Sequence, residues 1–120
     1  MNNLYSVISQ EKNETDLITV IAFNPQHSIF TDHFPGNPIV PGVVLMQLVR
    51  ELFEQKTSQK LELTECAEAK FLHTIIPQRH EPVRVIIQET NNLQLKSEIW
   101  LEEKLCFKMK GTYKQSVHVL

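Results

Sequence analysis

Residues 33–47, with the sequence HFPGNPIVPGVVLMQ, decide how the rest of this 120-residue chain is organised. The stretch holds three of the six prolines and two of the three glycines. Because proline fixes φ and glycine permits unusual backbone angles, these residues predict a loop of defined shape. Pro41 suits the first turn of a helix, where its missing N–H would be unpaired anyway. The loop therefore brings His33 and the amide of Gly42 to a helix N-terminus, which favours a developing negative charge.

Length and composition are those of one globular domain, expected to span residues 1–120. The formal net charge of −2 gives no overall nucleic-acid signature. Without a signal peptide or an apolar run of about 20 residues, the chain is expected to be cytoplasmic, with no membrane partner. Cys66 and Cys106 lack a CxxC pair and metal-ligand spacing, so reduced thiols are expected. Metal-ligand spacing is also missing among His27, His73, His80 and His118.

Local patterns predict two strands at residues 4–9 and 17–23, and then a helix at 41–56 that is apolar nearly all round at its start. Further strands are expected at residues 61–72, bent near 64–65, and at 83–89, 93–101 and 105–109. Asn91 and Asn92 predict a tight hairpin turn, because asparagine tolerates the left-handed region. Gly111 is expected to break the pattern of the last strand.

The order of these elements predicts an α+β fold. A single apolar helix must bury its surface against another layer. A curved antiparallel β-sheet wrapped around one long central α-helix does this most economically. A chain this short also gains from dimerisation, because small domains bury a smaller share of their surface.

Residues 33–43 have the form H-F-P-G-x-P-x-x-P-G-V. This closely resembles the motif of the hot-dog-fold 3-hydroxyacyl-(acyl-carrier-protein) dehydratases of fatty acid synthesis. Residues 69–71 (AKF) and 75–77 (IIP) are similar to that family's A-R-F strand and its V-V-P-type continuation. No N-terminal helix like that of the fatty-acid enzymes is expected before the first strand, so the chain resembles a compact relative. The resemblance implies a hot-dog fold and a dimer with the site at the subunit interface.

Carried over residue by residue, the resemblance makes His33 the base and Gly42 the amide donor to the thioester carbonyl oxygen. It assigns Phe34, Pro41 and Val43 to substrate binding. A histidine titrates near neutral pH and so suits removal of the α-proton. One oxyanion-hole donor contributes about 3 kcal/mol to such reactions. No metal or redox cofactor is implied.

The family's carboxylate position, five residues after Gly42, is Gln47 here, and Glu51 stands where the family usually has glutamine. Glutamine cannot take or supply a proton near neutral pH. Three interpretations are open. Gln47 positions water or substrate while Glu51 or a water completes acid catalysis; or it marks a weakened site in a chain that pairs with an active paralogue; or it marks a hot-dog thioesterase or binding module.

The resemblance thus implies dehydration of a 3-hydroxyacyl chain on an acyl carrier protein, giving the trans-2-enoyl thioester in a fatty acid, polyene or related lipid pathway. The alternatives are an acyl-thioester hydrolase and a catalytically weak subunit of a heterodimeric dehydratase. A homodimer, a higher oligomer and a heterodimer with a paralogue are all compatible with the motif. Nucleic acid is not an expected partner.

Two further groups of residues each have two interpretations. Four lysines near the C-terminus either face an acidic carrier or protect an exposed strand edge, and we favour the edge: Lys104, Lys108, Lys110 and Lys114. Four phenylalanines either line an acyl tunnel or fill the core, and we expect most of them in the core: Phe30, Phe34, Phe53 and Phe71.

Overall fold

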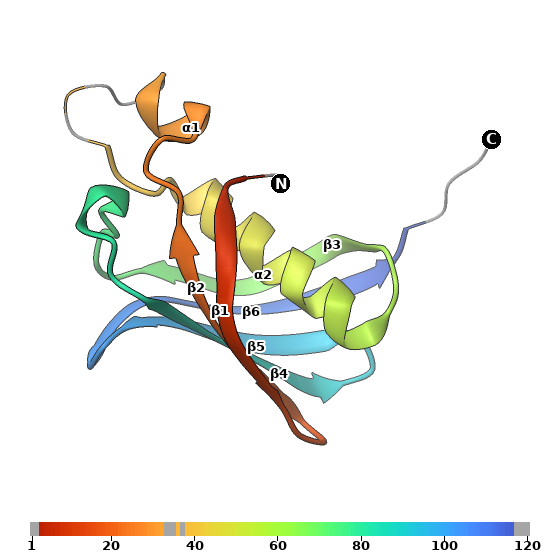
Figure 1. Ribbon diagram of the computed structural model, residues 1–120. Coiled ribbons are helices and arrows are strands. Elements are labelled where there is room, and N and C mark those ends of the chain that lie inside the picture. Colours follow the sequence, from red (N-terminus) through yellow and green to blue (C-terminus); the bar gives the residue numbers. More distant parts are fainter. Residues whose placement is uncertain (1–2, 33–35, 37, 117–120) are drawn as a thin grey trace.

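The computed structural model describes residues 3–32, 36 and 38–116, and Figure 1 shows their arrangement. His33 and Phe34 lie outside the described residues. The elements in chain order are β1 (Tyr5–Lys12), β2 (Asp16–Phe23), α1 (Ser28–Thr31), α2 (Gly42–Thr57), β3 (Leu61–Phe71), η1 (Pro77–Arg79), β4 (Val83–Asn91), β5 (Gln94–Leu101) and β6 (Lys104–Gln115).

The six strands form one antiparallel sheet in the order β1-β2-β4-β5-β6-β3. In Figure 1 the sheet curves around α2, which lies along one of its faces. Strands β2, β4 and β5 alternate buried and more exposed residues, because successive side chains point to opposite faces. This is the hot-dog arrangement that the resemblance implied, so the predicted fold class is confirmed.

The helix α2 holds the core together through one apolar face. Its buried residues are three or four positions apart, the spacing that places side chains on one side of a helix: Val44, Leu45, Leu48, Val49, Leu52 and Phe53. Burying each of the larger side chains contributes about 1.5–3 kcal/mol. The helix ends where Ser58 adopts a left-handed conformation with φ of 57°, and its N–H donates to the Glu54 carbonyl oxygen.

Two local predictions need correction. The left-handed residue of the β4–β5 hairpin is Leu93, with φ of 54°, and neither asparagine has a positive φ. The Leu93 N–H donates to Glu89 Oε2, while its carbonyl oxygen accepts from the Tyr113 N–H, so neighbouring strands hold this conformation. Strand β6 also continues through Gly111, because irregularities on β3 near Glu65 maintain the pairing.

The edge strands of the sheet are β1 and β3, whereas β6 lies between β5 and β3. The prediction that the β6 lysines protect a strand edge is therefore wrong. Lys108 and Lys110 instead pair with Glu68 on β3, and Lys114 pairs with Glu62. Periodicity predicted the strand correctly, but strand order depends on long-range pairing that periodicity does not contain.

Two of the four phenylalanines fill the core as expected, since Phe30 and Phe53 are fully buried. Phe71 instead stays 55% exposed at the end of edge strand β3. Within residues 3–32, 36 and 38–116, no helix combines the length and apolarity needed to cross a bilayer.

Candidate active site

The first turn of α2 leaves backbone amides without a side-chain cap. Pro41 is the N-cap, with φ of −62° and ψ of 149°, and its carbonyl oxygen accepts from the N–H groups of Val44 and Leu45. Gly42 is the first helical residue, and the first turn contains no acidic side chain. The positive end of the helix dipole is therefore available to a ligand oxygen, as the role predicted for Gly42 requires.

Glycine at position 42 leaves room for the ring of Phe71. No glycine in the described residues has a positive φ, so conformational freedom is not its purpose here. A Cβ atom at Gly42 would lie 2.5 Å from Cε1 of Phe71. The Phe71 ring also packs on Phe107, with 4.9 Å between the ring centroids. The glycine thus lets the end of β3 approach the helix start.

The loop that ends at Pro41 is anchored to the second matched segment of the sequence. The Val40 N–H donates to the Ile75 carbonyl oxygen at 2.9 Å. Val40 and Ile75 are both buried. The two segments that carry the family resemblance are therefore in contact at the start of α2.

Gln47 and Glu51 share one face of α2, as their spacing predicted, and both line a cavity of about 560 Å³. Gln47 also lines a second cavity of about 400 Å³ with Val43 and Tyr113, between α2 and the β3–β6 side of the sheet. No hydrogen bond joins the Gln47 side chain to another residue in the described part of the chain, so its amide can bind a ligand or a partner subunit.

Glu51 is held by a residue that sequence reasoning missed. The Tyr5 hydroxyl on β1 donates to Glu51 Oε1 at 2.9 Å. Burial, together with the hydrogen bond and charge of Glu51, raises the pKa of Tyr5, so its phenol stays protonated as a donor. The two residues are 46 positions apart, and nothing in the local sequence marks the pairing.

Arg50 is a second residue that the sequence analysis left without a role. It lines both cavities next to Gln47, and its buried Nε atom has no hydrogen-bond partner within residues 3–32, 36 and 38–116. No ion pair involves Arg50 in the part of the chain that the structure describes. The guanidinium of Arg50 places a cation one helical turn from Gln47.

Comparison with known proteins identifies the family. The ApeI-like family model, described as ApeI dehydratase, matches residues 9–111. This chain belongs to the ApeI-like dehydratase family. No curated protein sequence matches it.

Solved structures show the same fold as this chain. The Dehydratase Heterocomplex ApeI:P from Xenorhabdus doucetiae matches with a TM-score of 0.80 and 17% identity, over 92% of this chain and 97% of that chain. An uncharacterized protein from Erwinia carotovora subsp. atroseptica matches with a TM-score of 0.70 and 16% identity, over 92% of this chain and 93% of that chain. A protein named as a thioesterase from Shewanella oneidensis matches with a TM-score of 0.58 and 12% identity, over 96% of this chain and 85% of that chain. At these identities the likeness concerns the fold alone.

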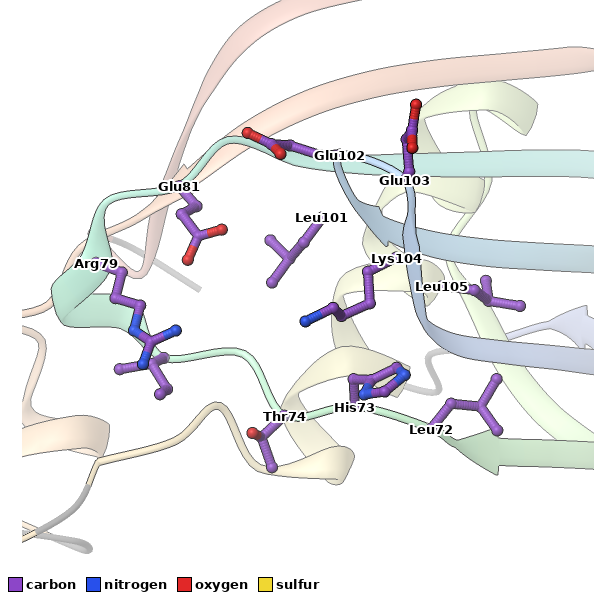
Figure 2. Close-up of a pocket in the computed structure, with 11 residues that line it drawn as sticks. Leu72, His73, Thr74, Arg79, Glu81, Leu101, Glu102, Glu103, Lys104 and Leu105 are labelled. Carbon is purple, nitrogen blue, oxygen red and sulfur yellow. The ribbon is translucent and has the colours of Figure 1, made fainter.

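A cavity of about 860 Å³, larger than the two beside Gln47, lies elsewhere in the described part of the chain (Figure 2). It opens between the segment that follows β3 and the β5–β6 hairpin. In Figure 2 the side chains of Arg79, Glu81 and Lys104 extend toward its centre. Its lining includes none of the described residues predicted for the site, so cavity size alone does not locate that site.

The open side of α2 carries exposed apolar groups. Val43 is 71% exposed, and large apolar residues on and just after β3 are also exposed: Leu63, Phe71 and Leu72. An edge strand with free backbone groups and apolar side chains favours pairing with another chain.

Proposed function

We propose that this chain removes water from a 3-hydroxyacyl thioester carried on an acyl carrier protein and forms the trans-2-enoyl thioester. The step breaks one C2–H bond and the C3–O bond, forms the C2–C3 double bond and releases water. It needs no oxidant or other co-reactant. His33 takes the α-proton, and the Gly42 N–H stabilises the charge on the thioester oxygen.

The observation that carries the proposal is the uncapped N-terminus of α2 at Gly42, directly after the His33 motif. Enolate-like charge develops on the thioester oxygen when the α-proton leaves. A backbone amide at a helix N-terminus stabilises such charge without reorganising. Pro41 and Val43 flank the amide, and we assign them, with Phe34, to binding the acyl thioester.

The leaving hydroxide needs a hydrogen-bond donor or a positive charge. The Gln47 amide is a donor, and Arg50 adds a cation on the same face of α2. Glu51, held by Tyr5, is the nearest carboxylate along this face and remains our candidate for the acid role through a bound water. The three side chains form the polar half of the proposed site.

We further propose that a second hot-dog subunit completes the site along β3. The exposed residues Val43, Leu63 and Phe71 support this interface. The Xenorhabdus complex is named a heterocomplex, which supports a paralogue as the second subunit as well as a second copy of this chain. The second candidate function is a weakly active partner subunit, which is favoured by the uncharged Gln47 at the family's carboxylate position.

Product analysis with a 3-hydroxyacyl carrier protein tests the proposal. The purified chain is expected to form the enoyl thioester, and His33→Asn is expected to lower the rate about 10³-fold. Gln47→Glu separates the roles of that residue. A gain in rate indicates a weakened native site, and a loss indicates that glutamine has its own function.

Free acid together with free thiol would instead identify a hydrolase and overturn the proposal. Turnover only after a paralogous subunit is added would establish the partner-subunit alternative. Native mass spectrometry of the same samples reports which assembly is active.

A further inference from the structure

The cavity of about 860 Å³ in Figure 2 is separate from the candidate active site. It lies between residues 72–81 and the β5–β6 hairpin at residues 101–105, and we call it the hairpin cavity. No residue of α2 lines it. Its volume is in the range of about 300–1,000 Å³ that is typical of small-molecule sites. The dehydration proposed above uses none of its lining residues.

Part of the wall of the hairpin cavity is aliphatic. Four side chains form this part: Leu72, Ile76, Leu101 and Leu105. Leu72 is 46% exposed, and Leu101 packs against the core from this side. A cavity with apolar walls and a few converging polar groups is the usual form of a small-molecule site.

Three charged side chains converge on the hairpin cavity. In Figure 2, Arg79, Glu81 and Lys104 extend toward its centre from two different segments of the chain. Among the residues that the structure describes, no ion pair joins Glu81 to either of the two cations. Charges of both signs thus face the same space without neutralising one another by direct contact.

The backbone fixes where Arg79 and Glu81 begin. His80 lies between them in the left-handed conformation, with φ of 55°, which residues other than glycine adopt rarely. The His80 N–H donates to the carbonyl oxygen of the buried Pro77 at 3.2 Å. Pro82 follows Glu81 directly and restricts the chain further.

Lys104 is fixed on the opposite wall. The hairpin turn before it contains Glu102 with φ of 50°, and the Cys106 thiol donates to the Lys104 carbonyl oxygen at 3.5 Å. The Cys106 carbonyl oxygen accepts from the N–H groups of Leu72 and His73 at 2.8 and 3.2 Å, which joins the two walls. The cavity is therefore preorganised, and a ligand does not have to order its walls.

The signs of the charges decide which class of ligand fits. An anion alone would meet the carboxylate of Glu81, and a cation alone would meet Arg79 and Lys104. The described residues offer no group of His, Cys, Asp or Glu side chains placed to hold a metal ion. Glu103 also lines the cavity, but in Figure 2 its carboxylate points away from the centre. A small molecule that carries both charges matches all three converging groups.

We propose that the hairpin cavity binds a small zwitterion with an apolar substituent, namely an α-amino acid with an aliphatic or aromatic side chain. The amino-acid carboxylate pairs with Arg79, whose planar guanidinium suits bidentate contact, and with Lys104. The ammonium group pairs with Glu81. The apolar side chain of the ligand lies on the aliphatic part of the wall, which includes Leu72 and Leu105.

Titration of the isotope-labelled chain with L-leucine, followed by the NMR chemical shifts of the backbone amides, tests the site. Saturable shifts are expected at residues 72–81 and 101–105 in the millimolar range. Arg79→Gln and Glu81→Gln are each expected to weaken binding about fivefold, since the pairs lie partly in solvent. The matched controls remove the same charges elsewhere: Glu103→Gln and Lys12→Gln are each expected to change binding less than about twofold.

Ligand analogues test each charge of the zwitterion. Leucinamide lacks the carboxylate and isocaproate lacks the ammonium group, so both are expected to bind at least about fivefold more weakly than L-leucine. Equal binding of either analogue, or of inorganic phosphate, would overturn the proposal.

The proposal also fails if neither L-leucine nor L-phenylalanine gives saturable shifts at these residues up to about 20 mM. Equal weakening by Glu81→Gln and Glu103→Gln would show that only the overall charge matters and would overturn it as well. Thermal melting of each variant checks that the fold is intact. None of these measurements depends on dehydratase activity, so they stand whether or not the proposed function holds.

Discussion

The two flanks of α2 differ in how they meet the sheet. Toward edge strand β1, polar side chains close the gap, because Tyr5 donates to Glu51 at 2.9 Å and Gln10 donates to Gln55 at 3.3 Å. The Gln10 amide also donates to the Thr19 hydroxyl. This flank is joined by hydrogen bonds within one chain.

Toward edge strand β3, the same helix is open. The cavity of about 400 Å³ on this side is lined by Val43, Gln47, Arg50 and Leu63. Among the described residues, none forms a hydrogen bond with the buried Arg50 Nε. The flank toward β1 is therefore joined by side-chain hydrogen bonds within the chain, although Val7 and Ile8 on β1 are exposed, whereas the flank toward β3 has apolar and polar groups that the proposed second subunit would cover. Four variants or conditions test this contrast.

The largest expected effect concerns association. Leu63→Lys places a second cation beside Arg50 on the open flank, so self-association or pairing with a paralogue should weaken about tenfold. The matched control is Val7→Lys on β1, where an apolar residue of similar exposure lies on the closed flank. Sedimentation equilibrium measures both. Equal weakening by the two variants would contradict the assignment of β3 as the interface.

On the closed flank, Tyr5→Phe removes the hydrogen bond to Glu51 and should lower the free energy of unfolding by about 1 kcal/mol, because the acceptor is a partly buried carboxylate. Urea unfolding monitored by circular dichroism gives the value. A stability equal to that of the unmodified chain would mean that this flank is held by packing alone.

Alkaline pH tests the tyrosine of the open flank. Burial raises the pKa of Tyr113 to about 12 from the value of about 10 expected in the unfolded chain. The contribution of Tyr113 to the free energy of unfolding is constant below pH 10. It falls as the pH rises from 10 to 12, because the tyrosine loses its proton at lower pH in the unfolded chain than in the folded one. At pH 10.5 the loss should be about 0.8 kcal/mol. Urea unfolding of Tyr113→Phe and of the unmodified chain, each at pH 8 and pH 10.5, isolates the part of the loss that comes from Tyr113. An equal loss of free energy of unfolding in both proteins would contradict a raised pKa of Tyr113.

The smallest effect concerns the contact that joins β3 to the start of α2. Gly42→Ala should displace the half-exposed Phe71 ring and lower stability by about 0.5 kcal/mol, since lost ring stacking exceeds the gain in helix propensity. In a double-mutant cycle with Phe71→Leu, the Gly42→Ala cost should disappear. Additive effects would show that the ring does not pack on the glycine.

Much of the fold could be predicted from the sequence because its signals are local. The period of two in β2, β4 and β5 and the apolar face of α2 both reflect the geometry of a single element. Pro41 and Gly42 likewise predicted the helix start correctly. For the candidate site, the contiguous motif correctly placed Gly42 at the helix start, and the spacing correctly placed Gln47 and Glu51 on one face of α2, while their roles stay predictions.

By itself, then, the sequence determined the element types, the helix start and the membership of a dehydratase family. Only the tertiary structure decided that β6 is an interior strand, that Tyr5 holds Glu51, and that Phe71 covers Gly42. The physical reason is that these contacts join residues far apart in the chain. Their free energy depends on the order and register of strands, which the periodicity of any one segment does not specify.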